Sequence, residues 1–207
     1  MAKESSFKNM VITLLVITLI SSALLGGVYE LTKDAIAAVK IRKINNGISN
    51  VLPAFDNNPS ENVHKKFIDG DTVYVYTATK DEKIVGSAVQ TFTNTGYGGK
   101  IVMMVGFLTN GEINKIDVIS HSETPGLGDK IEPKKTDFNV QFNGKNPKDY
   151  KLAIRKEGGD VDAMSGSTVS SKAFCDAVAR AYKVFREDIM KDQGKWDDVS
   201  GATQQKK

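Results

Sequence analysis

A cluster of small hydroxyl residues near the C-terminus offers a site for a phosphate group. Residues 162–170 read Asp-Ala-Met-Ser-Gly-Ser-Thr-Val-Ser, and an amphipathic helical pattern follows directly. The free backbone N–H groups and the dipole at a helix N-terminus favour phosphate. The hydroxyl of Thr168 could also hold such a group permanently, through a phosphoester bond. The stretch therefore predicts the binding of a phosphate-bearing ligand, such as a mononucleotide, at the start of the helix.

Helix capping is a simpler interpretation of the same residues. Serine and threonine commonly precede helices because their side chains accept hydrogen bonds from the N–H groups of the first turn. The helix is expected from Ser171 onward because apolar residues recur there at helical spacing. These residues are Phe174, Ala177, Val178, Ala181 and Phe185. Taken alone, the short motif leaves capping and ligand binding open.

Composition excludes several classes of protein. The 207 residues, 40% of them hydrophobic, suit one domain with an appendage. A net charge of +3 without a basic stripe argues against nucleic-acid binding. The single cysteine, Cys175, rules out an internal disulfide and a CxxC motif, and we expect it to be buried. The two histidines, His64 and His121, lack the spacing of metal ligands, so no metal site is expected.

An uncharged stretch near the N-terminus predicts a membrane span. It runs for 18 residues, from Val11 to Val28, which is about 27 Å of helix and close to the thickness of the hydrocarbon core. A cleaved signal peptide is the alternative, but its apolar region runs to only about 7–15 residues. We expect a retained span at residues 10–29, after a cytoplasmic N-terminus at 1–9. Basic residues lie on both sides, lysines alone before the span and lysines with Arg42 after it, and long domains translocate largely regardless of charge, so the sequence leaves sidedness open.

The remaining chain predicts an α+β domain. A helical stalk is expected at residues 30–55, with its helix ending before Pro53. Four strands are expected at residues 72–79, 84–93, 100–108 and 113–119, and Asn110-Gly111 is a strong hairpin signal between the last two. Consecutive strands of this kind form an antiparallel sheet, which the C-terminal helix completes. The domain is expected to span residues 56–195, followed by a polar tail at 196–207.

Two glycine-rich loops accompany these strands. The first, residues 96–99, reads Gly-Tyr-Gly-Gly, and its glycines permit close approach of a ligand while Tyr97 could stack on a flat ring. The second, residues 121–128, reads His-Ser-Glu-Thr-Pro-Gly-Leu-Gly, where Pro125-Gly126 favours a type II turn. Glu123 and Thr124 offer an acceptor and a hydroxyl in this loop. The alternatives are a flexible loop and a solvated turn.

Four motifs occur in the order that is found in one known family. Residues 96–99 and 123–128 are followed by Gln-Phe-Asn-Gly-Lys at 141–145, and residues 162–168 resemble the flavinylation motif Asp-x-x-Ser-Gly-Ala-Thr. Ser167 stands where that motif usually has alanine. Over nearly its whole length the chain resembles the G subunit of the Rnf ion-translocating electron-transport complex. It is similar, more distantly, to the C subunit of the sodium-pumping NADH:quinone oxidoreductase.

The resemblance implies a covalent flavoprotein. FMN would be joined through its phosphate to Thr168 by a separate Mg-dependent flavin transferase that uses FAD as donor. Ser165, Gly166 and Ser167 would form the small-residue frame of the motif, and Asp162 would complete the pattern that the transferase recognises. The residues of the loop over the ring would be Glu123, Thr124, Gly126, Leu127 and Gly128, with Tyr97 as a stacking residue.

The resemblance also implies a role and a location. The flavin would relay electrons between reduced ferredoxin and NAD, coupled to the movement of Na⁺ or H⁺, together with other membrane and iron–sulfur subunits. The chain would act as a redox subunit of a translocase, without catalytic residues of its own. The FMN domain would face the extracytoplasmic side of the cytoplasmic (inner) membrane. Two alternatives remain open at this point: a C-type subunit of the quinone reductase, and a membrane-tethered binding or scaffold domain without flavin.

Overall fold

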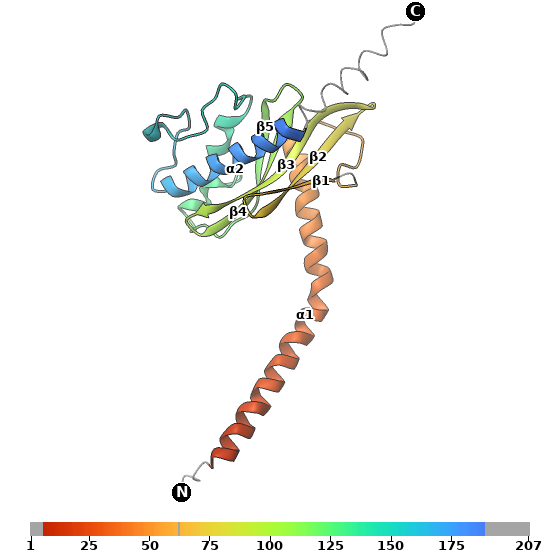
Figure 1. Cartoon of the computed structure of the whole chain (residues 1–207), viewed down its shortest axis with the longest axis vertical. Helices are drawn as coiled ribbons and strands as arrows, with labels where there is room; N and C mark the ends of the chain where they lie inside the picture. Colours follow the sequence, from red (N-terminus) through yellow and green to blue (C-terminus); the bar gives the residue numbers. More distant parts are fainter. Residues whose placement is uncertain (1–5, 62, 189–207) are drawn as a thin grey trace, which may run out of the picture. The chain divides into compact units, whose positions relative to one another are not determined.

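The computed structural model describes residues 6–61 and 63–188, which fall into two compact units. One unit comprises the residues up to Lys43 and the other begins at Ile44. The polar tail expected at 196–207, the end of the predicted domain and the first five residues lie outside the described part of the chain. Figure 1 shows a long N-terminal helix, an antiparallel sheet and a C-terminal helix, which confirms the α+β prediction.

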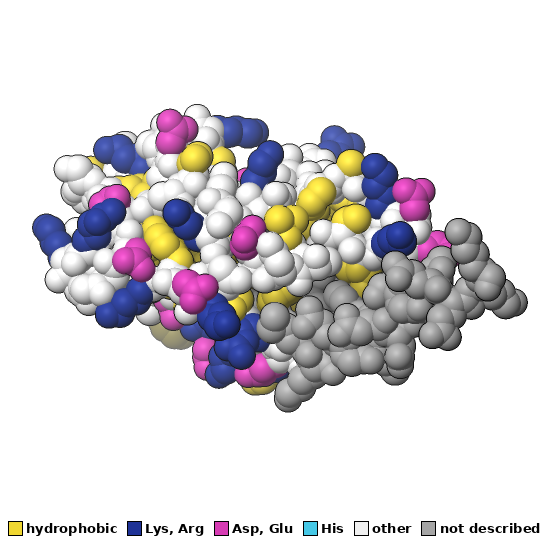
Figure 2. Space-filling model, turned by 90° about the horizontal axis from the view of Figure 1, so that it is seen from above, with side chains coloured by type: hydrophobic (Ala, Val, Ile, Leu, Met, Phe, Trp, Pro, Cys, Tyr) yellow, Lys and Arg dark blue, Asp and Glu magenta, His cyan; other side chains and the backbone are white. Residues whose placement is uncertain are grey.

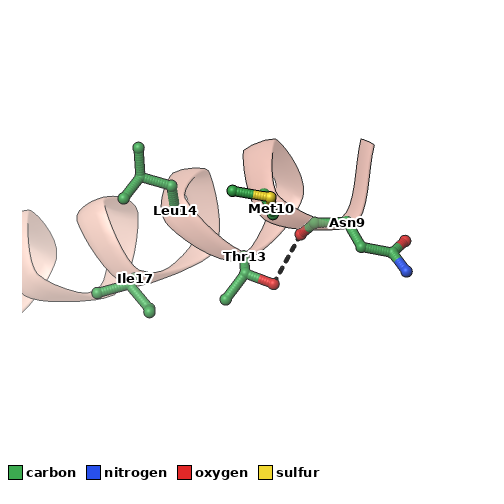
Figure 3. A pocket seen from close by; sticks show the side chains of 5 residues that line it. All are labelled: Asn9, Met10, Thr13, Leu14 and Ile17. Atoms are coloured by element: carbon green, nitrogen blue, oxygen red, sulfur yellow. Dashed lines mark hydrogen bonds between the residues drawn. The ribbon is translucent and has the colours of Figure 1, made fainter. Parts of the chain in front are cut away.

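A single helix, α1 (Phe7–Val51), contains both the predicted membrane span and the predicted stalk. Its N-terminal part is long and apolar enough to cross a membrane, and that part is exposed. Hydroxyl groups here bond within the helix, as Thr13 Oγ1 does to the carbonyl of Asn9 at 2.8 Å, beside a shallow hollow lined by Met10, Leu14 and Ile17 (Figure 3). Internal satisfaction of polar groups is what a hydrocarbon environment requires. The segment is therefore a candidate membrane span.

The second unit is built on a five-stranded antiparallel meander. The strands are β1 (Val63–Ile68), β2 (Asp71–Lys80), β3 (Lys83–Gly96), β4 (Gly99–Leu108) and β5 (Ile113–Ser120). The four predicted strands correspond to β2 through β5, and the sequence prediction missed β1. The β4–β5 hairpin turns at Asn110-Gly111 as predicted, with Gly111 at a φ of +85°. Three short 3₁₀ helices follow β5, namely Gly128–Ile131, Phe138–Phe142 and Arg155–Glu157.

Each face of the sheet is covered by one helical segment. On one face lies α2 (Thr168–Asp188), and all five apolar residues predicted for its inner face are buried in the main core. The other face receives residues from the end of α1, where Ile48 and Val51 pack with Met104 of β4. Fully burying an aliphatic or aromatic side chain stabilises the fold by about 1.5–3 kcal/mol. The sheet is thereby a rigid platform, and both its β3–β4 turn and the loop after β5 extend toward the N-terminus of α2.

Cys175 lies on the buried face of α2, as the sequence predicted. Burial raises the pKa of its thiol to about 12, so only about one molecule in ten thousand carries the reactive thiolate at pH 8. We expect the folded protein in detergent to be inert to Ellman's reagent at pH 8, whereas the denatured chain releases one equivalent of chromophore. Stoichiometric labelling of the folded chain would contradict this burial.

Candidate functional site

A pocket of about 410 Å³ opens at the N-terminus of α2. Its volume falls within the roughly 300–1,000 Å³ that is typical of ligand sites. Residues from the β3–β4 turn, from the loop after β5 and from the start of α2 line it together. They are Tyr97, Glu123, Thr124, Leu127, Gly128, Gly166, Ser167, Thr168, Val169 and Ser170. Three motifs that lie far apart in the sequence thus meet in one cavity.

Most residues that the sequence singled out line this pocket, and three do not. Gly126 and Ser165 are exposed in the neighbouring turns, and Asp162 is exposed upstream of the motif. Two lining residues were missed, Val169 and Ser170. The signal that could have found them is their place in the first turn of the helix directly after Thr168, where side chains and amides share the environment of the helix end.

Glu123 connects the three walls of the pocket. Its side chain is 5% exposed; Oε1 accepts a hydrogen bond from the N–H of Gly98 at 2.9 Å, and Oε2 accepts one from Ser170 Oγ at 2.5 Å. Hydrogen bonds to a carboxylate are shorter and stronger than those between neutral groups. Both oxygens therefore have protein donors, and the side chain holds the β3–β4 turn and α2 against the loop after β5.

A second set of polar contacts holds the loop after β5 in place. The N–H of Glu123 donates to His121 Nδ1 at 3.0 Å, and His121 Nε2 lies 2.7 Å from Glu132 Oε1. Because Nδ1 accepts, this network assigns the ring proton to Nε2, which donates to Glu132. Hydrogen bonds from His121 and Lys135 hold the pKa of Glu132 below its usual range. The loop is thus anchored at both the side chain and the backbone of Glu123.

Glycine is required where the loop passes this carboxylate. A Cβ placed on Gly128 would lie 2.2 Å from Glu123 Oε2 and 2.7 Å from Ser170 Oγ. The preceding turn has the predicted type II features, since Gly126 has a φ of +77° and the N–H of Leu127 donates to the carbonyl of Thr124 at 3.2 Å. Together the turn and Gly128 direct the loop past the N-terminus of α2.

The start of α2 has polar groups without partners. Thr168 is its first residue, and the first helical hydrogen bond runs from the N–H of Ser171 to the carbonyl of Ser167 at 3.0 Å. The N–H groups of Thr168, Val169 and Ser170 therefore have no acceptor among the described residues. Ser167 Oγ is buried and also has no partner there. The serine before the helix thus leaves the first turn uncapped, contrary to the simple capping interpretation.

Asp162 lies on the surface and outside the pocket lining. Its backbone is held by Gln141, whose Oε1 accepts from the Asp162 N–H at 2.8 Å and whose Nε2 donates to the Asp162 carbonyl at 3.2 Å. Its carboxylate pairs with the exposed side chain of Arg155, at 2.5 Å from Nε. The residue is exposed, and its hydrogen bonds go to Gln141 and Arg155, neither of which lines the pocket.

The pocket suits a ligand with an anionic end and a flat apolar end. The free amides and the hydroxyls at the start of α2 line this cavity, and Tyr97, Leu127 and Val169 expose apolar surface around it. No cluster of side chains that could hold a metal ion occurs in residues 6–61 and 63–188. On the face seen in Figure 2, charged side chains of both signs are interspersed with small apolar areas. These features favour a phosphorylated aromatic ligand.

Comparison with known proteins agrees with this geometry. Residues 96–183, which contain every residue that lines the pocket, match the FMN-binding domain. The G subunit of an ion-translocating oxidoreductase complex from Erwinia tasmaniensis is 43% identical over 110 residues, which cover 52% of this chain and 52% of that protein. This aligned part therefore spans only about half of that relative's length.

Longer alignments connect the chain to proteins of the same name. The G subunit from Salmonella typhi is 34% identical over 178 residues, covering 82% of this chain and 86% of that protein. The G subunit from Haemophilus influenzae is 34% identical over 174 residues, covering 80% and 83%. Because the identity exceeds 30% over more than two thirds of each chain, this chain belongs to the family of G subunits of ion-translocating oxidoreductase complexes.

Proposed function

We propose that this chain is the electron-relay subunit of a membrane-bound, ion-translocating ferredoxin:NAD oxidoreductase and that it carries FMN covalently, through a phosphoester to Thr168. The observation that carries the proposal is the position of Thr168. It is the first residue of α2, it lines the pocket, and its hydroxyl makes no hydrogen bond within the described part of the chain. Bound there, FMN would supply chemistry in steps of one or two electrons.

The two serine hydroxyls that line the pocket beside Thr168 are less accessible than that of Thr168, and the exposed Ser165 lies outside the pocket lining. Ser170 is 2% exposed, and its Oγ is committed to Glu123. Ser167 is 5% exposed, whereas Thr168 is only half-buried. A phosphoryl donor brought by another enzyme must reach the acceptor oxygen, so this difference in exposure favours attachment at Thr168.

The other lining residues would hold the flavin without reacting with it. The free amides of the first turn of α2 face the negative charge of the phosphate. Tyr97, Leu127 and Val169 offer exposed apolar surface to the ring, while Glu123 fixes the walls relative to one another. No described residue in the pocket is needed as a general acid or base for such a relay.

Partners and orientation follow as parts of the same proposal. The exposed α1 span would anchor the chain in the cytoplasmic membrane beside other membrane and iron–sulfur subunits of the complex. The domain would face the extracytoplasmic side, where a covalent bond prevents loss of the cofactor. The surface position of Asp162 leaves it accessible to a flavin transferase.

Replacement of Thr168 by valine tests the attachment site. Valine keeps the shape but removes the hydroxyl, so the variant should lose all covalent flavin while it remains folded. The measurement is in-gel flavin fluorescence after SDS denaturation, with the full chain co-expressed with a flavin transferase. Thr124→Val is the matched control because Thr124 is another pocket hydroxyl, and its band should stay fluorescent. A dark wild-type band would instead favour a membrane-tethered scaffold without flavin.

A further inference from the structure

We propose that Ser167 and the first turn of α2 form a phosphate-binding subsite that recognises the phosphate monoester of FMN by hydrogen bonds, independently of any ester bond. The inference rests on the proposed function in taking FMN as the ligand. It goes further because it gives Ser167 a role as a hydrogen-bond donor, at a position where the family motif usually has alanine. The consequence is that the domain should select a phosphorylated flavin even when no covalent bond can form.

The first observation is the state of the Ser167 hydroxyl. The residue is 5% exposed and lines the pocket, and its Oγ has no hydrogen-bond partner among the described residues. Burying a hydroxyl without a partner is unfavourable. Buried polar atoms in proteins normally have a partner, which can be a bound ligand. An acceptor in the pocket would supply the missing hydrogen bond.

The second observation concerns the backbone that follows. The N–H groups of Thr168, Val169 and Ser170 have no acceptor within the described residues, and they belong to a helix of 21 residues. Amides at a helix N-terminus attract anions through their hydrogens and through the helix dipole. A phosphate has enough oxygens to bond several of these amides and the Ser167 hydroxyl together.

The carboxylate of Glu123, which lines the same pocket, weakens the attraction of this site for a phosphate but does not abolish it. Both oxygens of Glu123 already accept hydrogen bonds, from the N–H of Gly98 and from Ser170 Oγ. These donors offset part of the negative charge of the carboxylate and hold both oxygens in fixed hydrogen bonds. The unpaired hydroxyl of Ser167 and the free amides are therefore the groups left to meet a phosphate.

The test removes the ester bond and measures affinity alone. The full chain, purified in detergent with Thr168→Val, is titrated with FMN and with riboflavin, and binding is followed by flavin fluorescence. Riboflavin has the same ring without the phosphate, so the ratio of the two dissociation constants reports on the phosphate subsite. We expect FMN to bind at least about tenfold more tightly, because hydrogen bonds to a charged group are strong.

A second substitution assigns this preference to Ser167. Adding Ser167→Ala should weaken FMN binding about tenfold and leave riboflavin binding unchanged. Alanine restores the usual family motif, so the variant is expected to fold. Ser87→Ala is the matched control, because Ser87 is another buried serine without a partner, on β3 and outside the pocket lining. It should change neither constant.

Several results would overturn the inference. Absence of FMN binding, equal affinity for FMN and riboflavin, or an equal effect of Ser167→Ala on both ligands would each exclude a phosphate subsite at Ser167. Inorganic phosphate should compete with FMN and not with riboflavin, and failure to compete would have the same meaning. Covalent attachment is read in the chain with Thr168 intact, so failure of this inference is distinguishable from failure of the proposed function.

Discussion

Replacement of Glu123 by alanine is expected to lower the free energy of unfolding by about 3 kcal/mol. The substitution removes the acceptors of two hydrogen bonds and leaves the N–H of Gly98 and the hydroxyl of Ser170 without partners. The Ser170 hydroxyl is buried, and a buried donor left unpaired costs about 1–3 kcal/mol, to which the lost bond to the more exposed Gly98 adds about 1 kcal/mol. The β3–β4 turn and α2 would then lose their common attachment to the loop after β5.

Glutamine at the same position is the informative control. Its amide oxygen can accept from Gly98, and its NH₂ group can donate to Ser170 Oγ, which then acts as the acceptor, so each partner keeps a hydrogen bond. We therefore expect Glu123→Gln to keep most of the stability that Glu123→Ala loses. Urea unfolding of the detergent-solubilised chain, followed by circular dichroism, gives both values. An equal loss of stability in the two variants would show that the negative charge of Glu123, and not its hydrogen bonds, stabilises the fold.

A comparably large effect is expected at Gly98, in the turn that carries Tyr97. A Cβ on Gly98 would lie 1.9 Å from the carbonyl oxygen of Ser122 and 2.9 Å from the nitrogen of Glu123. These are backbone atoms of the neighbouring loop, which cannot rotate away as a side chain can. We expect Gly98→Ala to cost about 3 kcal/mol and to separate the two loops, with loss of FMN binding in the fluorescence titration.

Gly126→Ala separates the effect of the clash from that of removing a glycine. Nothing lies within 4 Å of a Cβ at this position, and only its φ of +77° opposes the substitution. Backbone strain of this kind costs about 1 kcal/mol. In thermal unfolding, the melting temperature of Gly126→Ala should therefore be well above that of Gly98→Ala. The reverse order would show that the two loops are not packed as closely as the structure has them.

The fold could be predicted where local signals are strong. Asn110-Gly111 marks a hairpin, and the spacing from Phe174 to Phe185 marks the inner face of α2. The edge strand β1 escaped prediction because its sequence includes Lys65 and Lys66 and shows no regular alternation of buried and exposed residues. Charged side chains are common on edge strands, where they discourage pairing with other chains.

The site could be predicted as a set of motifs and not as a set of contacts. Glycine-rich loops and small hydroxyl residues before a helix are visible in the sequence. The bond between Glu123 and Ser170 is not, because it joins residues 47 positions apart and depends on how the loop after β5 packs on α2. For the same reason the sequence could predict Glu123 as a residue of the loop over the ring, but not that both its oxygens accept hydrogen bonds from protein donors.

The most direct test of covalent attachment is peptide mapping by mass spectrometry of the wild-type chain co-expressed with a flavin transferase. Trypsin should release residues 157–172, which contain Thr168 and the neighbouring serines. We expect this peptide to carry the mass of FMN less one water, with fragmentation placing the addition on Thr168. An addition on Ser167 or Ser170, or an unmodified peptide from a protein that bears covalent flavin, would contradict it.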